Sequence, residues 1–180
     1  MSTPETRHRD DVTGRAATVN ARKAIKVERT VGVRRPAPEL YRLWRDFANL
    51  PRFMRHVESV HCADDRHSHW VARVSGGKRV EWDAEIVNDI DGKLIAWKTV
   101  GDPDVAHAGS VHFTPVSGDV GTEVKIELDY EPPFARMIGQ IAAHLGLTVD
   151  SLVDDDLRRF KDYAEARSDV TSTPRPNDAH

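Results

Sequence analysis

The feature that most constrains this fold is a repeated alternation of apolar and polar residues in short segments separated by turns. Apolar residues occupy every second position in the segments 79–86 and 123–130, with charged residues between them. A period of two is typical of β-strands that bury one face and expose the other. Glycine-containing turns such as Asp91-Gly92 leave only short connections between these segments. The pattern therefore indicates an antiparallel sheet with one solvated face.

The same criteria predict seven strands, of which the last six form a meander. The predicted strands cover residues 24–31, 57–62, 68–74, 79–88, 94–100, 109–115 and 123–130.

Two short helices are predicted between the first and second strands. Apolar residues recur at helical spacing from Leu40 to Phe47, and Pro38 suits the first turn of that helix. We expect Asn49 to cap a second short helix over residues 50–55.

A long helical region is predicted at the end of the domain. After Pro133, apolar residues follow a helical period from Met137 to Ala164. Gly146 interrupts the stripe, so we expect a break there, with Thr148 capping the second part. The stripe needs an apolar partner, and one face of the sheet is the only large candidate. The expected fold class is therefore α+β, with a bent sheet wrapped around the C-terminal helix.

The ends of the chain differ in composition from its middle. Residues 1–23 contain many charged and few large apolar residues, and residues 168–180 are rich in Ser, Thr and Pro. Such segments rarely bury enough apolar surface to fold, so we expect two disordered tails. One globular domain is then expected over residues 24–167.

Composition excludes several classes of protein. With 26 Lys plus Arg against 29 Asp plus Glu, the net charge of −3 does not favour nucleic acid as a partner. Cys62 is the single cysteine and cannot form an internal disulfide. No signal peptide and no apolar run of roughly 20 residues is evident, so we expect a cytoplasmic protein.

Several segments resemble one family. Residues 38–54, with the sequence PELYRLWRDFANLPRFM, resemble a stretch of the polyketide cyclase/dehydrase and coenzyme Q-binding group of the START-like (SRPBCC) superfamily. The segments 80–86, 95–97, 108–113 and 157–161 resemble later parts of that group, in the same order. The resemblance spans about residues 25–165. It implies a helix-grip fold, in which a curved seven-stranded antiparallel sheet surrounds a long C-terminal helix.

The resemblance also implies an internal cavity that holds a lipid, an isoprenoid quinone or a polyketide-like molecule. A strongly curved sheet and one helix leave a volume that side chains do not easily fill, which supports a cavity independently. The alternative for each aromatic residue is ordinary core packing. The expected lining residues are Trp70, Trp82, Trp97, Phe113, Tyr130, Phe53, Met54, Met137, Ile138 and Ile141.

A cyclase or dehydratase is the alternative function, with His112, Arg73 and Tyr130 as candidate catalytic residues. Histidine suits proton transfer near neutral pH. Strand alternation places His112 opposite Val111 and Phe113, so it is catalytic only if its side of the sheet is concave, and solvated otherwise. A ligand-free interaction or stress-related module is a third possibility.

Other chemistry has weaker support. His67 and His69 share one strand face, but neighbouring His61 and Cys62 point in opposite directions, so no metal site is predicted. We expect Cys62 to be buried and unreactive. No phosphate-binding glycine loop is present, so no cofactor is predicted.

Two surface features have simple expected roles. The carboxylates Glu81, Asp83 and Glu85 are expected on the solvated face, with Arg73 and Lys78 as possible partners. Phe53 and Met54 either touch a membrane transiently or close one end of the cavity. No sequence pattern indicates the oligomeric state.

Overall fold

The structure is a computed structural model that describes residues 24–73, 75–101, 106–118 and 120–167. The two predicted tails lie outside the described residues. In chain order the elements are β1 (Ile25–Val33), α1 (Ala37–Arg45), the 3-10 helix η1 (Phe47–Arg52), β2 (Val57–Cys62), β3 (His67–Arg73), the 3-10 helix η2 (Ser75–Gly77), β4 (Arg79–Ile90), β5 (Leu94–Val100), β6 (His107–Pro115), β7 (Thr122–Tyr130), α2 (Pro132–His144) and α3 (Val149–Ala166).

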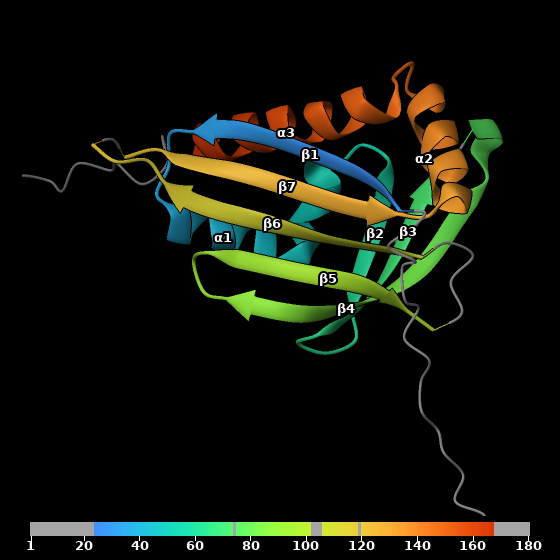
Figure 1. The fold of residues 1–180 in the computed structure, drawn as a ribbon, viewed down its shortest axis with the longest axis horizontal. Helices are drawn as coiled ribbons and strands as arrows, with labels where there is room; N and C mark the ends of the chain where they lie inside the picture. The colour runs from blue at the N-terminus through green and yellow to red at the C-terminus, as the bar shows by residue number, and fades with distance from the viewer. Residues whose placement is uncertain (1–23, 74, 102–105, 119, 168–180) are drawn as a thin grey trace, which may run out of the picture.

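All strands form one seven-stranded sheet in the order β1-β7-β6-β5-β4-β3-β2, with every pair antiparallel. The predicted meander from β2 to β7 is confirmed, and β1 completes the sheet by pairing along β7 from Ile25 opposite Tyr130. Figure 1 shows that the sheet bends strongly and that α1 and α3 lie on one side of it. The predicted α+β arrangement, with a curved sheet around the C-terminal helical region, is confirmed.

A β-bulge in β4 changes which side chains face the helices. The register of β4 against β5 shifts so that Val87 is an extra residue. Beyond the bulge Asp89 lies opposite Ile95, which is completely buried. Asp89 therefore reaches α1, where it accepts a 2.5 Å hydrogen bond from the Tyr41 hydroxyl and pairs with Arg45 at 2.8 Å. The bulge thus fixes α1 to the sheet.

The predicted cap of the second short helix is wrong. This helix is the 3-10 segment η1, and the Asp46 side chain caps it by accepting a 3.3 Å hydrogen bond from the Ala48 amide. Asn49 lies inside η1 and donates its side-chain amide to the Leu43 carbonyl at 3.2 Å. Because Asp46 follows α1 directly, its carboxylate begins the second helix three residues earlier than expected.

The predicted break in the C-terminal helical region is confirmed. The chain turns at Gly146, whose φ of 71° lies in the left-handed region that glycine tolerates. Thr148 caps α3 through a reciprocal box with Ser151, in which the Thr148 amide donates to the Ser151 hydroxyl at 2.8 Å. None of the helices in the described part of the chain is long and apolar enough to cross a membrane.

Aromatic rings fill the interior between α1, η1 and α3. The Trp44 ring lies 5.4 Å from that of Phe53 and 4.9 Å from that of Phe160, measured between centroids. Phe113 joins them at 6.5 Å from Trp44. All four side chains are almost completely buried. This part of the interior is therefore closely packed, and the open space described below begins on the other side of Trp44.

Candidate functional site

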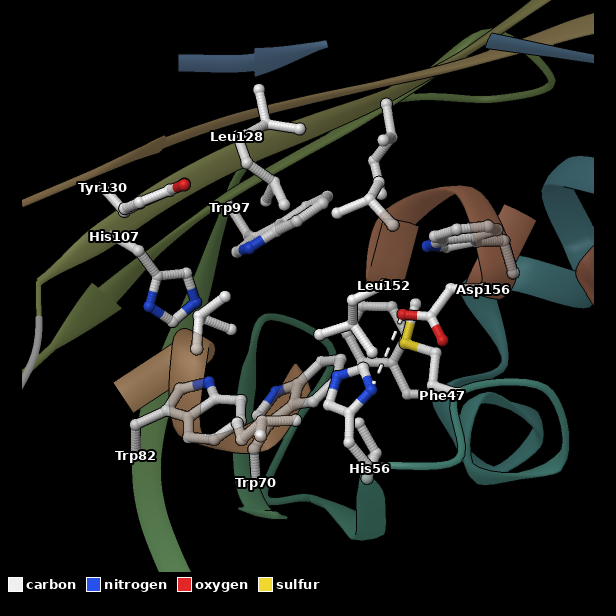
Figure 2. A pocket seen from close by; sticks show the side chains of 18 residues that line it. Phe47, His56, Trp70, Trp82, Trp97, His107, Leu128, Tyr130, Leu152 and Asp156 are labelled. Atoms are coloured by element: carbon white, nitrogen blue, oxygen red, sulfur yellow. Dashed lines mark ion pairs between the residues drawn. The ribbon is translucent and has the colours of Figure 1, made fainter. Parts of the chain in front are cut away.

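A partly enclosed cavity of about 110 Å³ lies between the sheet, α2 and α3, as Figure 2 shows. Every strand contributes at least one side chain to its wall, from Val27 on β1 to Tyr130 on β7. The wall is predominantly apolar, and its ionisable side chains are His56, His107, Tyr130 and Asp156. A cavity of roughly 150 Å³ is enough to admit benzene, so this space is on the scale of one aromatic ring.

All four tryptophans of the chain line this cavity: Trp44, Trp70, Trp82 and Trp97. Trp70 and Trp82 are directly opposite each other on β3 and β4, and their rings stack at 5.8 Å with an angle of 17° between planes. His107 packs edge-on against Trp82 at 5.7 Å. The sheet register therefore places flat ring surfaces around one space.

Trp97 extends into the wall because its cross-strand neighbour has no side chain. It lies opposite Gly109, and a Cβ atom at that position would be only 2.6 Å from the indole. Glycine is therefore needed at position 109 for the Trp97 ring to occupy its observed place.

A histidine and an aspartate meet in the wall between η1 and α3. His56 Nδ1 lies 3.6 Å from an Asp156 carboxylate oxygen, and both side chains are 11% exposed. This distance, drawn as a dashed line in Figure 2, is longer than a hydrogen bond. Within the described residues, neither His56 Nδ1 nor Asp156 Oδ1 has a hydrogen-bond partner.

Burial disfavours the charged form of both side chains. Removal from water lowers the pKa of His56 to about 4. Removal from water, reinforced by Asp155, raises the pKa of Asp156 well above its usual range, although Arg159 and Arg55 oppose that change. Burial therefore favours the neutral imidazole of His56 and shifts Asp156 toward its protonated form, which disfavours an ion pair between them.

Many of the predicted lining residues do line the cavity. They are Trp70, Trp82, Trp97, Tyr130, Met54, Ile138 and Ile141. Phe53 and Phe113 pack instead into the aromatic core beside Trp44. Because Phe53 is completely buried, it is not available as a membrane contact. The side chain of Met137 lies outside the described part of the structure.

The three predicted catalytic residues do not come together. Tyr130 lines the cavity, whereas His112 lies on the outer face of β6, because the alternate residues Val111 and Phe113 are buried inside. The His112 side chain is 39% exposed and contacts the Ser110 hydroxyl at 3.0 Å. Arg73 lies at the end of β3, is exposed, and donates a hydrogen bond to Glu58 at 3.0 Å.

The other sequence candidates lie on the surface. His67 contacts Asp64 at 2.9 Å and His69 contacts Asp83 at 2.8 Å. No group of three or more His, Cys, Asp or Glu side chains suited to hold a metal ion occurs in the described ranges. Cys62 is exposed, not buried as expected. Partial desolvation raises the pKa of its thiol, the opposite of what a nucleophile needs.

Residues 33–157 match the model of the family described as polyketide cyclase / dehydrase and lipid transport. The chain belongs to this family. A curated relative, an uncharacterised 17.2 kDa protein from the melC2-rnhH intergenic region of Streptomyces lincolnensis, is 34% identical over 146 residues, which cover 81% of this chain and 93% of the relative.

Solved structures of similar proteins have the same fold. DR_A0006 from Deinococcus radiodurans is 34% identical, with a TM-score of 0.63 and coverage of 79% of this chain and 99% of that one. The Zhui aromatase/cyclase of Streptomyces sp. R1128 also gives a TM-score of 0.63, at 17% identity, with coverage of 80% and 95%. A START superfamily protein from Mycobacterium smegmatis gives 0.57 at 15% identity, with coverage of 80% and 97%. The START-like helix-grip fold is therefore confirmed.

Two polar side chains of the cavity wall were not predicted, although the sequence pattern indicates that both are buried. Asp156 follows Val153 by three residues and precedes Phe160 by four, so it occupies the apolar stripe of α3. His107 is four residues before the buried Val111 in β6, so the two side chains point to the same face of the sheet. His56 lies in the connection between η1 and β2, where no periodicity identifies its environment.

Proposed function

We propose that this protein binds a small apolar molecule with a flat ring system, such as a quinone or a polyketide-like compound, in the cavity between sheet and helices. The observation that carries the proposal is that every tryptophan of the chain lines this one space. Aromatic faces attract other rings in stacked or edge-on arrangements beyond the gain from area burial. A ring therefore fits these walls better than an unbranched acyl chain.

Burial supplies the affinity in this proposal. Covering about 300 Å² of apolar ligand surface contributes about 7 kcal/mol before the cost of association is subtracted. The wall offers few polar groups, so binding does not depend on a strong ionic contact.

Intrinsic fluorescence tests the proposal without a label, because the tryptophans surround the site. We expect the one-ring compounds benzene, p-xylene and p-cresol to change the emission and raise the melting temperature in a concentration-dependent way. Trp82→Ala removes half of the stacked pair and is expected to weaken the response. Val87→Ala, at an exposed residue of β4, is the matched control.

The opposite result also has a defined meaning. If no ring-bearing compound changes either the fluorescence or the melting temperature, the binding function is wrong. The ligand-free interaction module then becomes the better interpretation.

A second candidate is dehydration or cyclisation of a poly-keto substrate, and the buried His56–Asp156 pair favours it. Loss of water from a β-hydroxy ketone needs a base that takes the proton beside the carbonyl and an acid that protonates the departing hydroxyl. His56, whose imidazole burial keeps neutral, would take the first proton, and Asp156, whose protonated form burial favours, would supply the second.

Mass spectrometry of a β-hydroxy ketone thioester incubated with the protein tests this candidate through loss of 18 Da. We expect His56→Gln and Asp156→Asn to abolish turnover and His112→Ala, on the outer face, to retain it. Absence of turnover by the unmodified protein would leave binding as the function.

A further inference from the structure

We infer that the His56–Asp156 pair selects ligands that carry one oxygen atom, as a hydroxyl or a carbonyl, on the edge of an otherwise apolar ring. This inference rests on the proposed binding function and specifies the ligand class. The oxygen would lie between the two side chains and supply the hydrogen bonds that they do not make with each other.

The surroundings of the pair are apolar. Figure 2 shows Phe47 and Leu152 beside the pair and the Asp156 carboxyl group extending from α3 toward His56. His56 Nδ1 and Asp156 Oδ1 are inaccessible to solvent and have no partner within the described residues. Buried polar atoms in folded proteins nearly always have a partner, so two neighbouring exceptions facing one cavity point to a polar group that arrives with the ligand.

The chemistry of the two groups matches a single oxygen. A protonated carboxyl group donates one hydrogen bond, and a neutral imidazole nitrogen donates or accepts one according to its tautomer. A ligand hydroxyl accepts from Asp156 and donates to His56, whereas a carbonyl oxygen accepts from both. An apolar ligand leaves both atoms without a partner, so it binds more weakly than a ligand that supplies these hydrogen bonds.

The neighbouring carboxylate provides an internal comparison. Asp155 pairs with Arg55 at 2.9 Å and does not line the cavity. The Asp155 carboxylate is therefore paired with a cation of the protein, whereas Asp156 Oδ1 has no hydrogen-bond partner within the described residues. Asp155 also raises the pKa of Asp156, so the control is instead Asp162, an exposed carboxylate of α3 that does not line the cavity.

Two ligands of almost the same shape, p-cresol and p-xylene, test the inference, because a hydroxyl in one replaces a methyl in the other. Their dissociation constants are measured by following the four indole N–H signals in NMR titrations at pH 7. The ratio of the two constants is compared between the wild type and Asp156→Leu. We expect Asp156→Leu to shift that ratio about tenfold in favour of p-xylene, and Asp162→Asn to leave it unchanged.

The possible failures are distinguishable. An unchanged ratio in Asp156→Leu, with both ligands still bound, overturns this inference and leaves the proposed function standing. Failure of the wild type to bind either ligand overturns both. If Asp156→Leu does not fold, His56→Phe removes the other member of the pair and is expected to shift the ratio in the same direction.

Discussion

Trp97 and Gly109 face each other across β5 and β6, and the indole occupies the space in which a side chain at position 109 would begin. A Cβ atom there would also lie 2.8 Å from the Leu128 side chain and 2.9 Å from the Glu127 carbonyl. The shape of this part of the cavity wall therefore depends on the absence of one methyl group.

Gly109→Ala is expected to destabilise the protein by about 1–3 kcal/mol, because the Trp97 ring and its strand neighbours must shift to admit the methyl group. Gly32→Ala is the matched control, since Gly32 is also a strand glycine and a Cβ atom there would meet nothing within 4 Å. Urea denaturation measures both changes. Equal free energies of unfolding for the two variants would show that position 109 is not tightly packed.

Tyr41→Phe is expected to lower the free energy of unfolding by about 1–2 kcal/mol, because it leaves Asp89 without the 2.5 Å hydrogen bond that joins α1 to the sheet. Burial and this hydrogen bond raise the pKa of Tyr41 to about 12. Tyr163→Phe is the control, because its hydroxyl makes a longer 3.3 Å bond to Asn49 and contacts the exposed Arg167. A larger loss at Tyr163 would contradict the structure.

His56 makes stability depend on pH. Its pKa falls from 6.5 in the unfolded chain to about 4 in the folded protein, so the unfolded chain binds the proton first as pH decreases. The His56 contribution to stability is therefore lost between pH 6.5 and 4, by about 2 kcal/mol from pH 7 to pH 5, whereas the raised pKa of Asp156 contributes in the opposite direction. Asp156 faces His56, and Asp155, Arg55 and Arg159 act on Asp156.

His56→Gln removes this titration while leaving those charged groups in place. Chemical denaturation at pH 7 and pH 5 should show a smaller loss in His56→Gln than in the wild type. His61→Gln, at an exposed histidine, is expected to follow the wild type. Parallel pH dependence in the wild type and His56→Gln would show that the imidazole is not buried in solution.

Thr148→Ala is expected to cost about 1 kcal/mol, because it removes the hydroxyl that caps α3 and bonds to Ser151. Thr148→Ser keeps a hydroxyl at this position and should retain most of the stability. Thermal unfolding compares the two variants. A Thr148→Ser variant as unstable as Thr148→Ala would indicate that the methyl group, not the cap, matters.

Local patterns were sufficient to predict most of the fold. Period-two alternation located the strands, and Gly146 with Thr148 identified the break between α2 and α3. The cap of η1 was mispredicted because Asp46 and Asn49 are both good capping residues, and the path of the chain after α1 decides between them. That path depends on tertiary packing, which a local pattern does not contain.

The candidate site was predictable in its apolar part and not in its polar part. Alternation placed Trp70, Trp82 and Trp97 in predicted strands, and the structure places all three in the cavity wall. It did not pair His56 with Asp156, because they are distant in sequence and meet only when α3 packs against η1 and β2. The strand pattern made His112 a candidate catalytic residue, although its side chain lies on the outer face of the sheet.

The cavity takes its wall from every strand and from both C-terminal helices. Ligand preference is therefore encoded at single positions scattered from Val27 to Asp156, and not in any contiguous motif. Each of these positions can change without disturbing the backbone hydrogen bonds of the sheet. Two members of the family can therefore share the fold and differ at wall positions such as His56, Trp70 and Asp156, which lie outside the segments that resemble the family.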